Sequence, residues 1–210
     1  DDNASMTTLV PLIETTRGGT LENQHFGAVA VTDTHGRLLA HAGDPHWITF
    51  TRSTLKPLQA LPFLQSGGPA RFGFGAPQLA MLCASHNGEP MHVAQVEAML
   101  HAAGLGPKAL QCGCHEPMYA EVVGATRPAP GSWDERHHNC SGKHTGFLCW
   151  CVQHGQPVGN YLAPGHPLQQ AVRREVARAT GMQPQDLRLG IDGCSAPNFA
   201  MPLSHLARGY

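Results

Sequence analysis

Lysine is scarce in this chain of 210 residues: Lys56, Lys108 and Lys143 are its only three lysines, and eleven arginines carry most of the positive charge. Lysine normally serves to solvate a protein surface. Lys56 and Lys143 instead lie in short motifs rich in Ser, Cys and Gly. This placement indicates that their amines serve chemistry rather than solubility.

Charge and long hydrophobic runs are scarce as well. Charged residues make up 14% of the chain, the formal net charge is −1 and there is no polybasic segment, so we expect no nucleic-acid partner. No apolar run reaches the ~18 residues that a membrane span requires, so we expect no membrane insertion. Residues 1–5 lack the basic and apolar regions of a signal peptide, which favours a cytoplasmic location.

The seven cysteines cannot all be paired with one another, because their number is odd. Without a signal peptide we expect a reducing compartment, in which they are thiols or metal ligands. One residue separates Cys112 from Cys114 and Cys149 from Cys151, whereas common zinc sites use C-x-x-C spacing. Most of the cysteines are therefore expected to be small buried hydrophobic residues.

Residue patterns predict a single α/β domain over residues 1–210, with no linker that would divide it. Hydrophobic residues make up 41% of the chain, enough for a sizeable core. A turn at residues 34–36 between two apolar runs predicts an antiparallel hairpin. The expected strands are 26–33, 37–42 and 187–192. Helical periodicity and helix-stop residues predict helices at 53–66, 76–84, 89–103, 141–153 and 166–180.

Ser53 and Lys56 form an S-x-x-K pair where the helix 53–66 is expected to begin. Residues three apart share one face of a helix, so the hydroxyl and the amine are within reach of proton transfer. Burial lowers the pKa of a lysine amine, which can then act as the base that activates a serine nucleophile. The alternative is a surface helix with an incidental Ser and Lys, because S-x-x-K alone is common.

Residues 83–90 place a second serine, Ser85, between an apolar helix and a polar turn. A side chain at such a position can project into a cleft. The alternative is that Ser85 caps the helix that follows, which is a common role for a serine before a helix.

Residues 137–144 combine one cysteine, one lysine and three histidines. Cys140 and Lys143 lie three apart at an expected helix start, where the helix N-terminus favours a thiolate. Sulfur and nitrogen donors favour zinc, and because lysine is a rare ligand the donor chemistry alone favours Cys plus His. The alternative is a polar loop that caps a core helix.

Residues 192–199 place a carboxylate and a thiol after a short strand, where α/β proteins often carry functional groups. Asp192 is a candidate to bind a substrate ammonium group, and Cys194 is a candidate second sulfur beside Cys140. A simple turn capped by the Asp192 carboxylate is equally compatible with this pattern.

Taken together, these motifs resemble one family, the zinc-associated L-asparaginases of the Rhizobium etli inducible type. This group differs from the bacterial threonine-nucleophile asparaginases and from the N-terminal-nucleophile enzymes. The resemblance extends from about residue 9 to the end of the chain. It rests on four segments in order, R-S-x-x-K-P-x-Q (52–59), A-S-H-N-G-E-P (84–90), H-N-C-S-G-K-H (138–144) and D-G-C-S-A-P-N-F (192–199).

The resemblance implies a fold similar to that of serine β-lactamases and penicillin-binding proteins, an α/β sheet packed by helices. It implies hydrolysis of L-asparagine to L-aspartate and ammonia. Ser53 would be the nucleophile, with Lys56 as its general base. Ser85 would belong to a second Ser/Lys pair beside them.

The resemblance also implies a zinc site of Cys140, Lys143 and Cys194 with a water as fourth ligand, in place of the Cys-plus-His set. The metal is expected to aid substrate binding rather than to attack the amide. Arg52 and Asp192 are the candidates for binding the carboxylate and ammonium ends of the substrate. A homodimer is also expected.

Members of the resembled family continue past the position of Tyr210, so we expect this chain to lack a C-terminal part. That part should contain the lysine that partners Ser85 and strands that complete the sheet, since Lys108 lies in a loop and is a poor substitute. A chain that ended at Tyr210 would be expected to be unstable, with little or no activity.

Two other functions remain open at the level of sequence. One is a different Ser/Lys acyl hydrolase, although the S-D-N and K-T-G motifs of β-lactamases are absent from the chain. The other is a non-catalytic fragment that binds zinc or an amino acid.

Overall fold

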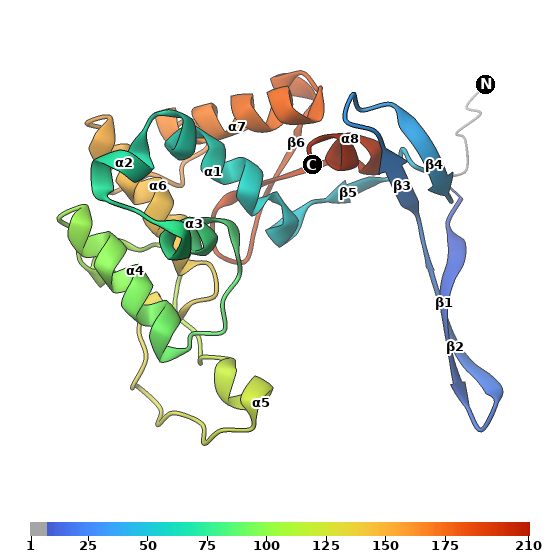
Figure 1. The fold of residues 1–210 in the computed structure, drawn as a ribbon, viewed down its shortest axis with the longest axis horizontal. Coiled ribbons are helices and arrows are strands. Elements are labelled where there is room, and N and C mark those ends of the chain that lie inside the picture. Colours follow the sequence, from blue (N-terminus) through green and yellow to red (C-terminus); the bar gives the residue numbers. More distant parts are fainter. Residues whose placement is uncertain (1–7) are drawn as a thin grey trace. The chain divides into compact units, whose positions relative to one another are not determined.

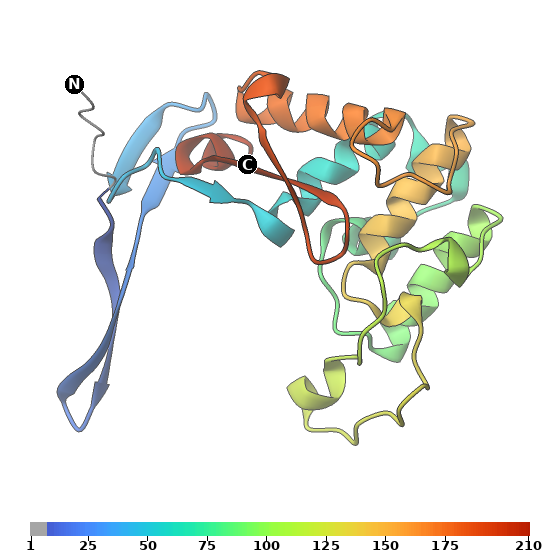
Figure 2. The same cartoon turned by 180° about the vertical axis from the view of Figure 1, so that it is seen from behind.

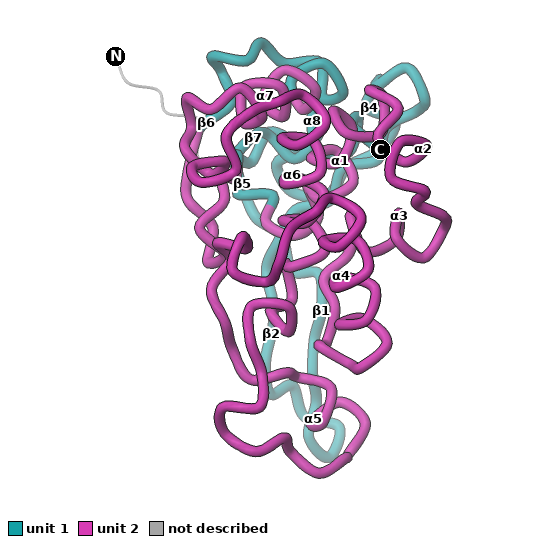
Figure 3. Tube along the Cα trace, turned by 90° about the vertical axis from the view of Figure 1, so that its left-hand side faces the viewer, with its two compact units in different colours: residues 1–51, 177–188, 199–210 teal, residues 52–176, 189–198 magenta. Residues whose placement is uncertain are grey.

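The computed structural model describes residues 8–210, which form a mixed α/β protein with helices and three small sheets (Figures 1 and 2). Residues 1–5, where the sequence has no signal-peptide pattern, lie outside the described residues. The described chain forms two compact units, each built from non-contiguous segments (Figure 3). Unit 1 holds the described residues up to Thr51 together with 177–188 and 199–210, and unit 2 holds 52–176 and 189–198.

Unit 1 contains two antiparallel hairpins. They are β1 (Val10–Arg17) with β2 (Thr20–Gly27), and β3 (Val29–Thr32) with β4 (Leu38–Ala42). The Asp33 carboxylate closes the β3–β4 turn by accepting hydrogen bonds from the amides of His35 and Arg37. The hairpin predicted at 26–33 and 37–42 is therefore confirmed.

A third sheet has the strand order β5-β7-β6. Its strands are β5 (Ile48–Phe50), β6 (Arg188–Ile191) and β7 (Pro197–Pro202). β5 pairs antiparallel with β7, from Ile48 opposite Pro202 to Phe50 opposite Ala200. α8 (Leu203–Arg208) follows β7 and contacts β3. The strand predicted at 187–192 is confirmed as β6.

Unit 2 is mostly helical. Its helices are α1 (Lys56–Gln65), α2 (Gly68–Phe72), α3 (Ala76–Cys83), α4 (Pro90–Ala102), α5 (Tyr119–Val123), α6 (Ser141–Gln153) and the greater part of α7 (Pro167–Thr180). The 3₁₀ turns are η1 (Arg52–Leu55), η2 (Pro107–Ala109) and η3 (Glu135–His137) in unit 2, and η4 (Pro184–Asp186) in unit 1. The five helices predicted from periodicity are confirmed, with ends that differ by at most three residues.

Helix α6 forms the core of unit 2, because every residue from Ser141 to Cys151 is buried. It contacts α1, α3 and α4. Two glycines allow this close packing. A Cβ at Gly142 would collide with the carbonyl oxygen of Met81 in α3, and a Cβ at Gly146 would meet the side chain of Leu82. The N-terminus of α6 therefore lies directly against the C-terminal end of α3.

Several elements were not predicted, namely β1, β2, β5, β7, α2, α5 and α8. In β1 and β2 nearly every side chain is exposed, so no alternation of polar and apolar residues marks these strands in the sequence. None of the described helices combines the length and the apolar character needed to cross a bilayer.

Candidate active site

Ser53 and Lys56 lie where η1 meets α1, so the S-x-x-K pair does stand at a helix start. Pro57 follows Lys56 in the first turn, where a missing amide costs no helical hydrogen bond. Ser53 is exposed, whereas Lys56 is only 1% exposed. Arg52, directly before Ser53, has a φ of 51°, a left-handed conformation that is costly for an L-residue and indicates a constrained backbone.

Ser85 stands between the two residues of this pair. Lys56 Nζ lies 2.6 Å from Ser85 Oγ and 3.2 Å from the carbonyl oxygen of Ala84, and donates to both. Ser85 Oγ donates to Ser53 Oγ at 3.2 Å. The result is a continuous hydrogen-bonded chain, Ser53–Ser85–Lys56, with two exposed hydroxyls and one buried amine. Among the described residues the amine partner of Ser85 is thus Lys56, which the resemblance assigned to Ser53.

The surroundings of Lys56 favour its neutral form. Burial is the main cause, and it lowers the pKa of the amine because the charged form loses its hydration. Cys140 acts in the opposite direction and raises the pKa of Lys56, whereas the charge of Lys143 lowers it further. The lowered pKa makes the neutral amine, the form that can accept a proton, easier to reach, as a general base requires.

Arg52 and Asp192, the candidates for binding the charged ends of a substrate, lie next to each other. Arg52 Nε is 2.9 Å from Asp192 Oδ1, and the two side chains are 70% and 12% exposed. The Asp192 carboxylate also accepts hydrogen bonds from the amide of Gly193 and the side chain of Asn198. Asp192 is therefore held from three sides, whereas Arg52 is the more exposed of the two.

Cys140, Lys143 and Cys194 come together in a second, buried group. Lys143 Nζ lies 3.2 Å from Cys194 Sγ. The Cys140 thiol shares a hydrogen bond with the same sulfur, and this bond lowers the pKa of Cys194 and raises that of Cys140. The hydrogen bond therefore favours the thiolate form at Cys194 and the protonated form at Cys140.

His144, directly after Lys143, belongs to this buried group and was given no role of its own from the sequence. Its Nδ1 lies 2.8 Å from Tyr161 Oη. Its Nε2 is buried and has no partner with hydrogen-bond geometry among the described residues, although the ring lies near enough to Cys194 to help lower the pKa of that thiol. The only sequence signal for it was its place in the motif 137–144.

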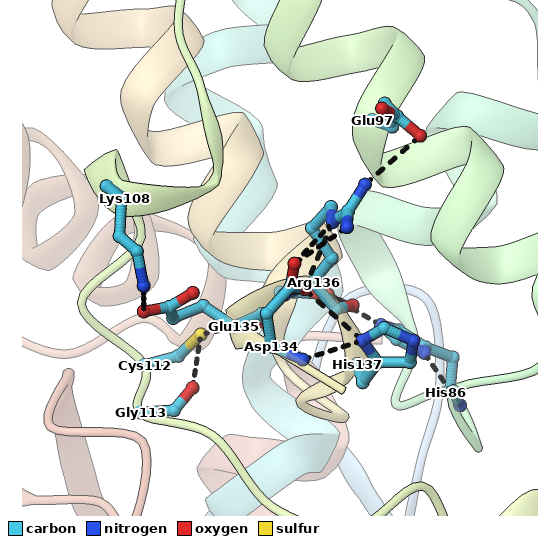
Figure 4. Close-up of polar contacts among 11 residues, drawn as sticks. His86, Glu97, Lys108, Cys112, Gly113, Asp134, Glu135, Arg136 and His137 are labelled. Carbon is cyan, nitrogen blue, oxygen red and sulfur yellow. Dashed lines mark hydrogen bonds and ion pairs between the residues drawn. The ribbon is translucent and has the colours of Figure 1, made fainter. Parts of the chain in front are cut away.

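Ion pairs hold the segment that leads into α6 (Figure 4). Asp134 caps η3 and binds Arg136 through both carboxylate oxygens, at 2.7 Å in the shortest contact. Arg136 also lies 3.2 Å from Glu97 of α4, and Glu135 lies 2.8 Å from Lys108. Lys108, which the sequence left without a role, is therefore part of a surface ion pair. Sequence reasoning missed this network, because Lys108 and Glu97 lie far along the chain from their partners Glu135 and Arg136.

A comparison with protein-family models decides the family. Residues 13–210 match the model of L-asparaginase II. The chain belongs to the L-asparaginase II family. A search of curated proteins found no match. All four motifs of the resemblance lie within the matched residues of this L-asparaginase II family chain.

Membership in the L-asparaginase II family supports an amidohydrolase that acts on asparagine. The match is to the family as a whole, so the zinc-associated Rhizobium etli type stays a prediction. For amide hydrolysis the site offers exposed hydroxyls as nucleophiles, a buried amine as base and an exposed guanidinium beside them.

Proposed function

We propose that this chain hydrolyses L-asparagine to L-aspartate and ammonia, with Ser53 as the nucleophile. The observation that carries the proposal is the hydrogen-bonded chain from exposed Ser53 through Ser85 to the buried amine of Lys56. A hydroxyl connected to a buried amine in this way can lose its proton as it attacks a carbonyl carbon. The family match supplies the amide as substrate class.

In the acylation step, Ser53 Oγ attacks the carbon of the asparagine side-chain amide. Its proton passes to Ser85 Oγ, while the Ser85 proton passes to neutral Lys56 Nζ. The relay runs along the Ser53–Ser85 distance of 3.2 Å and the Ser85–Lys56 distance of 2.6 Å, and it requires both hydrogen bonds to reverse, with Ser53 donating to Ser85 and Ser85 donating to the neutral amine. Donors placed around the developing oxyanion would lower the barrier, an effect often worth about 3 kcal/mol per donor.

Collapse of the tetrahedral intermediate breaks the carbon–nitrogen bond and releases ammonia. The leaving nitrogen takes the proton held by Lys56, returned through Ser85. Water then attacks the aspartyl ester on Ser53, and the same relay takes up its proton. When this second tetrahedral intermediate collapses, the bond between the acyl carbon and Ser53 Oγ breaks, the proton returns from Lys56 through Ser85 to Ser53 Oγ, and L-aspartate leaves. Each proton that Lys56 accepts is thus returned, so the amine is neutral again at the end of the cycle.

Arg52 and Asp192 would bind the substrate's α-carboxylate and α-ammonium groups. Their ion pair at 2.9 Å places opposite charges side by side, as the two ends of an amino acid require. The left-handed backbone of Arg52 would aim its guanidinium beside Ser53. In this arrangement the bound substrate replaces the ion pair between the two residues. Its α-carboxylate binds Arg52 and its α-ammonium group binds Asp192.

Ammonia release from L-asparagine tests the proposal. We expect release by the wild type and a fall of roughly a thousandfold or more in Ser53→Ala. Ser66→Ala is the matched control, because Ser66 bonds to Phe63 at the far end of α1. An aspartyl adduct on the Ser53 peptide, trapped by acid quench, would identify the nucleophile. Release unaffected by Ser53→Ala would refute the assignment, and no release by the wild type would favour a binding function.

We further propose that zinc binds at Cys140, Lys143 and Cys194. Cys140 and Cys194 place two buried sulfurs within hydrogen-bond distance of each other, and zinc binds cysteine sulfurs. Zinc sites combine sulfur with nitrogen donors, so we expect the third ligand to be a nitrogen. The described residues contain no cluster of three His, Cys, Asp or Glu side chains for a metal, so the amine of Lys143 would supply that nitrogen. When bound, the metal would supply Lewis acidity and orient the substrate.

Metal analysis tests the zinc site without any assay of activity. Purified Cys140→Ser should contain far less zinc than the wild type. Cys112→Ser is the control, because Cys112 is an equally buried thiol whose hydrogen bonds within the described part of the chain go to the carbonyl oxygens of Gly113 and Glu135. Equal zinc in both variants would reject the site.

The relation to serine β-lactamases and penicillin-binding proteins is also a proposal. It is supported by the position of the S-x-x-K pair at the first turn of α1 and by the mixed α/β content. The homodimer and the cytoplasmic location stay predictions from the sequence.

A further inference from the structure

The loop between α3 and α4 carries Ser85 and, directly after it, a buried histidine. Ser85 is exposed, whereas His86 is only 4% exposed. A buried imidazole must have partners for both ring nitrogens, or the fold loses the hydrogen bonds that water would have made. The partners of His86 show what the residue does.

Both ring nitrogens of His86 are satisfied in a single tautomer. Nδ1 lies 3.1 Å from the amide nitrogen of Gly88, and since a backbone N–H can only donate, Nδ1 is the acceptor. In the neutral ring the proton is then on Nε2, which donates to Ser141 Oγ at 2.8 Å. The Ser141 hydroxyl in turn donates a hydrogen bond to the carbonyl oxygen of Arg136 at 2.7 Å. Burial lowers the pKa of His86 to about 4, so the ring is neutral near neutral pH.

The backbone of the loop that carries Ser85 and His86 also contacts the residues that precede α6. The amide of His86 donates to the carbonyl oxygen of Asn139 at 3.2 Å. Gly88 has a φ of 74°, and a Cβ there would lie 2.8 Å from Pro117 Cβ and 3.0 Å from the carbonyl oxygen of His137. The loop is therefore confined on both sides of His86.

Ser141, the partner of the ring, is itself immobilised. It begins α6 and is fully buried. The next residue, Gly142, packs against the carbonyl oxygen of Met81 near the end of α3. The hydrogen bond from His86 to Ser141 thus connects the Ser85 loop to the buried first residue of α6. A partner that is itself fixed in place restricts the movement of the loop.

We propose that His86 is a positioning residue that, through its Nε2–Ser141 hydrogen bond, holds Ser85 between Ser53 and Lys56. The inference rests on the proposed function, because Ser85 matters as the relay of that reaction. His86 does not touch the reacting atoms. Its role is to keep the 2.6 Å and 3.2 Å distances of the relay within reach of proton transfer.

Variants that keep one ring nitrogen at a time test the proposal. His86→Gln retains a donor near the position of Nε2, whereas His86→Asn retains an acceptor near Nδ1 and loses the donor. Ser141→Ala removes the acceptor of the bond. Thr145→Val is the control, because Thr145 is another buried hydroxyl of α6, and among residues 8–210 its hydroxyl donates to the backbone carbonyl of Ser141.

Asparagine hydrolysis should separate these variants. A displaced relay lowers kcat and leaves substrate binding intact, so Ser141→Ala and His86→Asn should each lose about 10- to 100-fold in kcat with KM changed less than about threefold. His86→Gln should recover most of the loss. The double variant His86→Asn/Ser141→Ala should be no worse than either single variant, since both break one bond. A Ser141→Ala kcat equal to that of Thr145→Val, or additive losses in the double variant, would overturn the proposal.

A measurement without substrate separates this inference from the proposed function. Nitrogen NMR of the wild type should show His86 as the neutral Nε2–H tautomer. Amide exchange at Gly88 should be slow in the wild type and in Thr145→Val, and much faster in Ser141→Ala. If the wild type releases no ammonia, the proposed function fails, but these spectra still decide whether the His86–Ser141 hydrogen bond holds the Ser85 loop. The Nδ1–H tautomer, or unchanged exchange in Ser141→Ala, would refute that role of His86.

Discussion

Lys56 is almost completely buried, yet its amine donates hydrogen bonds to the carbonyl oxygen of Ala84 and to Ser85 Oγ. These two bonds make its burial possible without a carboxylate partner. Each hydrogen bond recovers part of the desolvation cost of the amine, and the lowered pKa recovers more by favouring the uncharged form. A residue in this state is poorly suited to hold a fold together. It is well suited to exchange a proton with a neighbouring hydroxyl.

Replacing Lys56 with methionine should therefore abolish catalysis and spare the fold. Ammonia release is expected to fall by at least about a hundredfold, the usual contribution of a general base. The free energy of unfolding should not fall, because methionine fills the same space with no amine to desolvate. Lys108→Met is the control at an exposed amine and should leave activity unchanged. Steady-state kinetics and urea unfolding measure both, and a stable, active Lys56→Met would contradict the prediction.

His86 predicts a loss of stability in acid. Its folded pKa, about 4, lies below the ordinary value of 6.5, mainly because of burial and then because of His92, with smaller effects from Lys56, His138 and His115. Above pH 6.5 both states are neutral and the residue has no effect. Between pH 6.5 and about 4 the unfolded chain binds a proton that the folded chain does not, so stability falls, by at most about 3 kcal/mol.

Urea unfolding at pH 7 and pH 4.5 measures this loss in the wild type and in His86→Gln. The wild type should lose more free energy of unfolding over this interval, because glutamine does not titrate. Equal losses in the two proteins would show that His86 does not carry the effect.

Among single residues, the sequence predicted where Ser53 and Lys56 stand, but not that each hydrogen-bonds to Ser85 rather than to the other. Ser53 and Lys56 were paired by helical spacing, and both lie at the start of a helix. The place of Ser85 between them could not be predicted, because it depends on how α3 ends against α6. His86 was visible only as part of a motif, since its partner Ser141 is 55 residues away.

At the scale of elements, α6 is the helix on which both groups of the site depend. Its N-terminus carries Ser141 and Lys143, and its closeness to α3 is possible only because residue 142 has no side chain. Periodicity predicted the helix 141–153 correctly, but it could not predict the close contact, because that contact depends on the partner helix. The functional importance of α6 lies in this contact.

Gly142→Ala should separate α6 from α3. The new Cβ would collide with the backbone carbonyl of Met81, which cannot move alone, so we expect a loss of about 2–3 kcal/mol in the free energy of unfolding. Gly146→Ala is the matched control, since its Cβ would meet only the flexible end of Leu82 and alanine favours the helix. It should cost less than about 1 kcal/mol. Similar unfolding curves for the two variants would contradict this account.

At the scale of the whole molecule, the described chain divides into two compact units whose borders mostly fall inside secondary-structure elements. Residues 176 and 177 lie within α7, 188 and 189 within β6, and 198 and 199 within β7. No linker marks such borders, so composition and turn signals could not indicate them. Long periodic helices were predictable, whereas the division into units depends on contacts between distant segments.

The β1–β2 hairpin should be the least protected of the helices and strands that the structure describes. Both of its faces are open, and Leu12, Ile13, Leu21 and Phe26 are each more than 40% exposed. A two-stranded hairpin of this kind is marginally stable in water. Hydrogen exchange should therefore be fast in 10–27 and slow in α6, whose first eleven residues are buried. Slow exchange throughout 10–27 would show that another surface covers the hairpin.

The scarcity of lysine has a practical consequence for labelling. Of the three lysines, Lys56 and Lys143 are 1% and 4% exposed, whereas the side chain of Lys108 is 87% exposed. Reagents that acylate amines need access to the nitrogen, so among the lysine side chains they should modify Lys108 first. A fluorophore or surface attachment introduced in this way would leave both buried amines of the site untouched.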